Sequence, residues 1–150
     1  MSKMKQPILL IEDSPEDQEA TIRAFQRCGL ANPIIHCETG DEAIDYLFRR
    51  GRYSDPARSP RPGLILLDLN LPGTDGREVL GEIKKDLQLK TIPVIILTTS
   101  CEQHDIDNCY AAGANSYICK PITLASYIEA IQRFKNFWFE IAVFPKEEHV

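Results

Sequence analysis

The chain has 150 residues, of which 43% are hydrophobic and 26% charged, which suits one globular domain with a hydrophobic core of its own. Its net charge of −5 and pI of about 5.2 argue against electrostatic attraction to nucleic acid or an anionic membrane, so no direct nucleic-acid binding is expected. No apolar run reaches the roughly 18 residues of a membrane span, and the first residues lack a leader pattern, so we expect a cytoplasmic protein.

Strand-like and helix-like segments alternate along the chain. In order, the predicted elements are a strand at 8–11, a helix at 16–28, a weaker strand at 33–37, a helix at 41–50, a strand at 64–67, a helix at 76–87, a strand at 94–97, a helix at 103–112, a strand at 116–119 and a helix at 123–139. The strand runs lack polar alternation, which is typical of a parallel sheet covered by helices on both faces. The sequence therefore predicts an α/β fold of the (βα)₅ type.

The segment 49–63 interrupts this regular alternation. It is rich in Arg, Pro and Gly, which predicts a long surface loop. We interpret it as a connector with solvated arginines rather than as a phosphate site or a partner site.

Five cysteines are present, and none of them forms a CxxC pair. Their odd number and mostly apolar or helix-forming neighbourhoods favour reduced, mostly buried thiols over metal binding or redox chemistry. The five are Cys28, Cys37, Cys101, Cys109 and Cys119.

Polar side chains follow the predicted strands at the point where each strand ends. They are Glu12 and Asp13 after the first strand, Asp68 after the third, Thr98 after the fourth and Lys120 after the fifth. In an open, doubly wound sheet, ligands bind beyond the carboxyl ends of the strands, where the strand order reverses. We therefore expect three carboxylates, a hydroxyl and an ammonium to converge there.

This set of groups suits phosphoryl transfer. Three carboxylates in one crevice repel each other unless a cation neutralises them, and Mg²⁺ prefers oxygen ligands such as Asp13 and Asp68. Asp68 is placed to act as a nucleophile that forms an acyl phosphate. Lys120 and the Thr98 hydroxyl would then stabilise the phosphoryl oxygens.

Four motifs carry a resemblance to a known family. They are Ile-Glu-Asp-Ser at 11–14, Leu-Leu-Asp-Leu-Asn-Leu-Pro-Gly-Thr-Asp-Gly at 66–76, Ile-Leu-Thr-Thr-Ser at 96–100 and Ala-Gly-Ala-Asn-Ser-Tyr-Ile-Cys-Lys-Pro at 112–121. From about residue 6 to 139, the sequence resembles the response-regulator receiver domains of two-component signalling. The resemblance implies a flavodoxin-like fold with five parallel strands in the order 2-1-3-4-5.

The family roles transfer to the matching positions. The resemblance implies that Asp68 is the phosphoacceptor, that Asp13 and Asp68 bind Mg²⁺ directly, that Glu12 acts through a metal-bound water, and that the Asn70 backbone carbonyl completes the metal site. It also implies that Thr98 and Lys120 sense the phosphoryl group, that Tyr117 is an aromatic switch, and that the bond between Lys120 and Pro121 is cis. Such a protein is a switch that reacts at most once per activation and dephosphorylates slowly, rather than a turnover enzyme.

A narrower resemblance concerns the partner. The loop 49–63 and the aromatic ending 137–145 are similar to those of single-domain response regulators paired with bacterial phytochromes, so the resemblance implies a histidine kinase of phytochrome type as the partner. We expect one receiver domain over 1–150, with a core at about 6–139, an extension at 140–150 and no output domain. Thr99 departs from the smaller residue of many receivers and could restrict Tyr117 or the approach to Asp68.

The C-terminal helix predicts a homodimer. Leu124, Tyr127, Ile131, Phe134, Trp138 and Ile141 form one apolar stripe at steps of three and four residues, which can pack on the sheet. Ile128, Phe137, Phe139 and Phe144 lie off this stripe. We expect a second copy of the chain to cover them, the alternative being a tail that folds back over its own domain.

Three other functions remain in competition. A haloacid-dehalogenase-like phosphatase also uses an aspartyl phosphate, but it places a second Asp two residues after the nucleophile, where this chain has Asn70. A receiver-like module without phosphorylation would lack at least one active-site group, and none is missing. A nucleotide-binding domain would need a Gly-rich loop after the first strand, which here is followed by Glu12, Asp13, Ser14 and Pro15.

Overall fold

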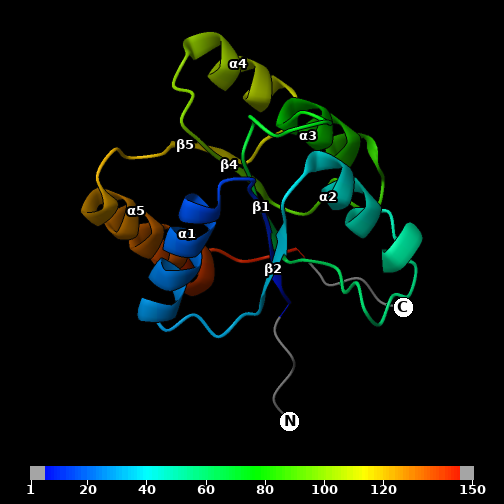
Figure 1. The fold of residues 1–150 in the computed structure, drawn as a ribbon, viewed down its shortest axis with the longest axis horizontal. Helices are drawn as coiled ribbons and strands as arrows, with labels where there is room; N and C mark the ends of the chain where they lie inside the picture. The colour runs from blue at the N-terminus through cyan, green and yellow to red at the C-terminus, as the bar shows by residue number, and fades with distance from the viewer. Residues whose placement is uncertain (1–5, 146–150) are drawn as a thin grey trace.

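Five parallel strands form a single sheet at the centre of the computed structural model, which describes residues 6–145 (Figure 1). The strands are β1 (Ile8–Ile11), β2 (Ile34–Cys37), β3 (Leu64–Leu67), β4 (Val94–Thr98) and β5 (Ser116–Cys119). Their spatial order is β2-β1-β3-β4-β5, which confirms the order implied by the resemblance. The order reverses between β1 and β3, so a crevice is expected beyond the carboxyl ends of these two strands.

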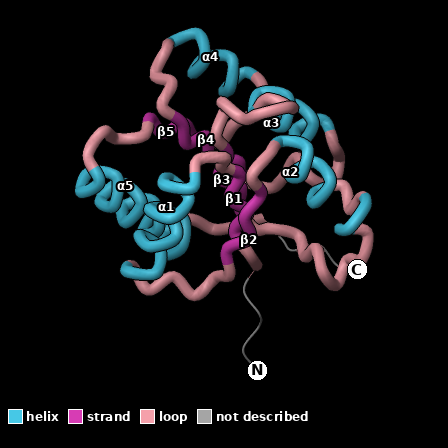
Figure 2. Tube along the Cα trace, viewed as in Figure 1, coloured by secondary structure: helices cyan, strands magenta, loops and turns pink. Residues whose placement is uncertain are grey.

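Helices cover both faces of the sheet. They are α1 (Pro15–Arg27), α2 (Gly40–Leu47), α3 (Gly76–Lys85), α4 (Gln103–Ala111) and α5 (Leu124–Asn136). Helices α1 and α5 lie side by side on one face, whereas α2, α3 and α4 lie on the other (Figures 1 and 2). Among residues 6–145, no helix combines the length and the apolar character that crossing a membrane requires.

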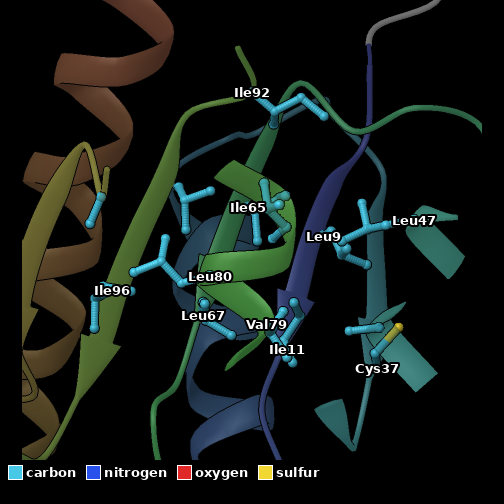
Figure 3. Close-up of a cluster of buried hydrophobic side chains, with 14 of the residues drawn as sticks. Leu9, Ile11, Cys37, Leu47, Ile65, Leu67, Val79, Leu80, Ile92 and Ile96 are labelled. Carbon is cyan, nitrogen blue, oxygen red and sulfur yellow. The ribbon is translucent and has the colours of Figure 1, made fainter. Parts of the chain in front are cut away.

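Each strand contributes to two hydrophobic cores because successive side chains point to opposite faces of the sheet. On the α2 and α3 face, Leu9, Ile65 and Ile96 pack against helix residues such as Val79 and Leu80 (Figure 3). On the α1 and α5 face, the alternate strand residues form a second core with residues of these two helices. The strand residues are Ile8, Leu10, Leu64, Leu66, Ile95 and Leu97, and the helix residues include Phe25, Ile131 and Phe134. Burial on both faces explains why the strand sequences lack polar alternation.

Local sequence signals explain where the helices begin and end. The Ser14 hydroxyl accepts a hydrogen bond from the Asp17 backbone N–H at 3.3 Å, and Pro15 occupies the first turn of α1, one residue before the predicted start. Helix α2 ends at Leu47, three residues earlier than expected. The reason is that Arg49 adopts a positive φ of 55°, which stops the helical path.

The loop that joins α2 to β3 is held by its own hydrogen bonds. The Ser59 side chain is buried, and its hydroxyl lies 2.8 Å from the Tyr53 carbonyl and 3.0 Å from the Asp55 carbonyl. The Tyr46 hydroxyl of α2 donates to the Pro60 carbonyl at 2.6 Å. These contacts show that residues 49–63 form an ordered connector. The expectation of solvated arginines is wrong for Arg61, which is half-buried and donates to the Leu47 carbonyl.

The C-terminal helix continues beyond α5 as a π-helical turn, Phe137–Ile141. The centre of the predicted apolar stripe is buried, namely Tyr127, Ile131 and Phe134. Both ends of the predicted stripe are wrong, because Leu124 is 63% exposed and Ile141 is 70% exposed. Leu124 is the first residue of α5, before the helix meets the core, and the wider π turn moves Ile141 away from the face that a 3.6-residue period predicts.

The chain after the π turn folds back on its own domain. The Phe144 ring lies 6.0 Å from the Trp138 ring and 5.5 Å from the Phe139 ring, and all three pack against the α1 and α5 core. The alternative to a dimer contact therefore accounts for these three aromatic residues. Phe137 and Val143 remain exposed. Residues 146–150 of the expected extension lie outside the described part.

Candidate phosphoryl site

The polar residues that the sequence singled out meet at the carboxyl ends of β1, β3, β4 and β5. Glu12, Asp68 and Thr98 are buried, although each carries a polar or charged group. Asp68 directly follows β3, and its backbone N–H donates to the Ile11 carbonyl at the end of β1. The Lys120 backbone N–H donates to the Thr98 carbonyl at 2.7 Å, which places the start of the lysine side chain beside β4.

The Lys120 ammonium lies at the centre of this group. Its Nζ donates to Glu12 Oε2 at 2.9 Å, to Asp68 Oδ2 at 3.0 Å and to Asp17 Oδ2 at 2.8 Å. The side chains of Lys120 and Glu12 are each only 4% exposed, and that of Asp68 is 8% exposed. All three donor positions of the ammonium are used, so the lysine is fixed within the acidic crevice.

Asp17 is a site residue that the sequence reasoning missed. It lies in the first turn of α1, and its side chain is 37% exposed. The sequence feature that could have indicated Asp17 is its position in the first turn of a helix that begins two residues after Asp13. A carboxylate at that position lies beside the same sheet edge, where the α1 N-terminus also favours negative charge.

Three carboxylates form a cluster that suits a divalent cation. One carboxylate oxygen from each of Glu12, Asp13 and Asp68 lies within 4.8 Å of the other two. Glu12 and Asp68 are buried, whereas Asp13 is exposed at the mouth of the cluster. Hard oxygen ligands with an open, water-accessible side fit an ion such as Mg²⁺, which retains several waters when it binds.

Burial changes the acid–base properties of the cluster. Desolvation raises the pKa of Glu12 to about 7, and the Asp68 charge acts in the same direction, although the hydrogen bond from Lys120 opposes it. Burial alone would lower the pKa of Lys120, but its hydrogen bonds to Asp17 and Glu12 and the charge of Asp68 raise that pKa overall. Lys120 is therefore a permanent cation among these acids.

The backbone around Asp68 is shaped by a tight turn. Asp68 Oδ1 accepts a hydrogen bond from the Asn70 backbone N–H at 3.2 Å, which orients the carboxylate. The Gly76 backbone N–H donates to the Leu69 carbonyl at 2.9 Å, and a Cβ at position 76 would lie only 2.1 Å from the Asp68 carbonyl oxygen. Only glycine allows α3 to begin this close to the end of β3.

Thr98 and Tyr117 both contact the loop between β4 and α4. Thr98 Oγ1 accepts a hydrogen bond from the Ser100 backbone N–H at 3.4 Å. The Tyr117 hydroxyl donates to the Ser100 carbonyl at 2.8 Å, and its ring is half-buried. Thr99, the residue that departs from many receivers, is exposed. The two residues expected to form a switch therefore both contact Ser100.

Two expectations at this edge are wrong. No peptide bond within residues 6–145 is cis, so the bond between Lys120 and Pro121 is trans. The trans form is intrinsically favoured, and the long lysine stem reaches its carboxylate partners from it. The expectation of reduced thiols holds for Cys37 and Cys109, which are free and buried, but Cys101 and Cys119 are joined by a disulfide. Their sequence separation of 18 hid this proximity, which arises only because β4 and β5 are adjacent.

Comparisons with known proteins agree with this geometry. The family model of the response regulator receiver domain matches residues 8–132. Response regulator Rcp1 from Synechocystis sp. is 40% identical over 138 residues, which cover 92% of each chain. The probable methanogenesis regulatory protein FilR2 from Methanothrix harundinacea is 37% identical over 87% of this chain and 82% of its own.

Solved structures give the same result. The Mn²⁺-bound form of response regulator Rcp1 superposes with a TM-score of 0.89 at 39% identity, and the match covers 95% of this chain and 100% of that one. The phosphorylated cyanobacterial phytochrome response regulator RcpA superposes with a TM-score of 0.88 at 39% identity, over 94% and 99% of the two chains. Receiver domains are signalling switches rather than turnover enzymes, and the acidic cluster fits the divalent metal that they bind. On the combined ground of sequence, fold and site, this chain belongs to the response regulator receiver domain family.

Proposed function

We propose that this protein is a stand-alone response regulator that accepts a phosphoryl group from a histidine kinase onto Asp68. The observation that supports this most directly is the buried Asp68 carboxylate, which accepts a hydrogen bond from Lys120 at 3.0 Å and forms an acidic cluster with Glu12 and Asp13. Buried acids with a charge partner in a crevice are typical of reactive sites. The proposed role is a switch that reacts once per activation.

In the proposed reaction, a carboxylate oxygen of Asp68 attacks phosphorus, and the bond between phosphorus and the donor's imidazole nitrogen breaks. Lys120 then pairs with a phosphoryl oxygen, and the Thr98 hydroxyl donates to another. Asp13 and Asp68 would hold Mg²⁺ directly, with Glu12 acting through a bound water and Asn70 through its carbonyl. When bound, the ion neutralises charge on the phosphoryl oxygens.

The proposed output passes through the loop between β4 and α4. Movement of Thr98 toward the phosphoryl oxygens would displace Ser100, whose carbonyl is the acceptor for the Tyr117 hydroxyl. Tyr117 could then turn inward and change the surface formed by α4, β5 and α5. A partner that binds this altered surface would carry the signal onward.

The proposal also covers the phosphoryl donor, the cellular location and the oligomeric state. The similarity to Rcp1 and to the phytochrome response regulator RcpA supports a histidine kinase of phytochrome type as the phosphoryl donor. We also propose a cytoplasmic location, one receiver domain over the 150 residues without direct nucleic-acid binding, and a homodimer formed through the C-terminal segment.

Acetyl phosphate with Mg²⁺ tests the phosphoacceptor. Wild-type protein is expected to gain one phosphoryl group by intact-mass spectrometry, and Asp68→Asn is expected to gain none. Asp45→Asn, which changes an exposed aspartate on α2, is the matched control and should be labelled like the wild type. Chelation of Mg²⁺ should abolish labelling of the wild type and of Asp45→Asn. Full labelling of Asp68→Asn, or labelling that survives chelation, would show that the assignment is wrong.

A further inference from the structure

A pair of cysteines outside the phosphoryl chemistry carries a further inference. Cys101 lies in the loop between β4 and α4, and Cys119 is the last residue of β5. Their Cα atoms are 5.7 Å apart, within the range that a disulfide spans, and the structure joins their sulfurs. Cys101 is exposed and therefore accessible to an oxidant or a reductant, whereas Cys37 and Cys109 are buried.

The position of the pair links it to the proposed switch. Cys119 is opposite Thr98 in the register of β4 and β5, so the disulfide closes a small ring over Thr98, Thr99, Ser100 and Cys101. The Tyr117 hydroxyl and the Cys119 sulfur both approach the Ser100 carbonyl, at 2.8 Å and 3.9 Å. Residues 98–101 therefore cannot move toward Asp68 without carrying the end of β5, unless the disulfide opens.

A second contact holds the other side of the same loop. The Ser100 hydroxyl donates to Asp105 Oδ2 at 2.6 Å, and Asp105 is paired with Arg77 of α3 at 2.9 Å. These interactions involve single hydrogen bonds and ion pairs, which can exchange during a conformational change. The link between Cys101 and Cys119 is the one covalent restraint on the loop among the described residues.

We propose that Cys101 and Cys119 are a redox couple whose disulfide holds the loop in its unphosphorylated position and whose reduction allows the loop to switch. The regulatory part rests on the function proposed above, whereas the couple itself does not. A disulfide oxidant such as glutathione disulfide supplies the chemistry. The Cys101 thiolate attacks one sulfur and expels one glutathione thiolate, and the Cys119 thiolate then attacks Cys101 and expels the second. The dithiol loses two protons and two electrons, and two glutathione molecules are formed.

The first experiment tests the couple. Protein equilibrated in glutathione buffers of increasing oxidation is quenched, alkylated and mapped by peptide mass spectrometry. We expect a single intramolecular bond between Cys101 and Cys119, in wild type and in Asp68→Asn alike. Cys28→Ser is the matched control and should form the same bond, whereas Cys101→Ser should form none. If Cys101 and Cys119 are both alkylated at every buffer ratio, or if either pairs with another cysteine, the proposed couple is wrong. This outcome does not depend on whether Asp68 accepts a phosphoryl group.

The second experiment tests the coupling to the phosphoryl site. The equilibrium constant for oxidation by glutathione disulfide is measured with and without beryllofluoride, an acyl-phosphate mimic whose binding is followed separately by fluorine NMR. Because linkage is reciprocal, we expect the mimic to lower the oxidation constant about fivefold or more. An unchanged constant with the mimic bound would overturn the coupling. Absence of mimic binding to the reduced protein would instead overturn the phosphoryl site on which the coupling depends.

Discussion

At the scale of the residue, one cation organises the site. Lys120 was predicted from its place after the fifth strand, and the structure puts its ammonium against Glu12, Asp17 and Asp68. Glu12, Asp13 and Asp68 could be predicted as neighbours because parallel strands end at a common edge. Asp17 could not be predicted, because its contact with Lys120 depends on how α1 packs beside the sheet. An acidic residue in the first turn of a helix is usually explained by its favourable interaction with the helix N-terminus alone.

Replacement of this cation should destabilise the protein. In the presence of a chelator, Lys120→Met is expected to lower the free energy of unfolding by about 3 kcal/mol, because Glu12 and Asp68 remain buried without their partner. Arg133→Met removes an exposed ion pair with Glu129 and should cost less than about 0.5 kcal/mol. Urea denaturation measures the change in the free energy of unfolding for both variants. Equal effects of the two substitutions would contradict the structural role given to Lys120.

At the scale of the element, the pattern of apolar residues predicted every strand to within a residue or so, because strands buried on both faces leave an uninterrupted apolar signal. Helix ends were less accurate. The end of α2 depends on Arg49, whose positive φ has no signal in an arginine side chain. The loop that follows it was predicted only as a loop, because its order arises from contacts between residues such as Tyr46 and Pro60.

The buried hydroxyl within this loop provides a test at the same scale. Ser59→Ala is expected to lower the free energy of unfolding by about 1 kcal/mol, because the Tyr53 and Asp55 carbonyls lose a donor. Ser54→Ala, which changes an exposed serine of the same loop, should change it by less than about 0.5 kcal/mol. Thermal or urea unfolding provides the values. If Ser59→Ala unfolds like the wild type, the loop does not depend on this hydroxyl.

At the scale of the whole molecule, the C-terminal segment divides into two parts. Trp138, Phe139 and Phe144 cover the protein's own core, whereas Phe137, Ile141 and Val143 remain exposed. The periodicity of the sequence could not separate these groups, because the π turn changes the face on which each side chain lies. The proposed dimer therefore depends on the exposed group, and Trp138 is unsuitable as a probe because its loss would damage the monomer.

Analytical sedimentation tests whether the exposed residues of the C-terminal segment form the dimer contact. We expect the wild type to sediment as a dimer at micromolar concentration and the double variant Phe137→Ala with Ile141→Ala to sediment as a monomer, since it loses exposed apolar surface while every buried core residue is kept. Phe137 contacts the Trp138 ring, so urea unfolding of the variant checks that its monomer stays folded. Leu87→Ala, which changes an even more exposed apolar residue after α3, should remain dimeric. A monomeric wild type, or a double variant that stays dimeric, would count against assembly through this segment.

The bonds of Lys120 also join parts of the chain that are synthesised at different times. The lysine is separated from Asp68 by 52 residues along the chain and from Glu12 by 108. Translation delivers β1 and β3 well before β5, so a nascent chain that ends before residue 120 carries the acidic residues without their cation. Such a chain lacks the ammonium that contacts Glu12 and Asp68 in the folded protein. Under the function proposed above, the ability to accept a phosphoryl group would therefore be acquired in one late step of synthesis.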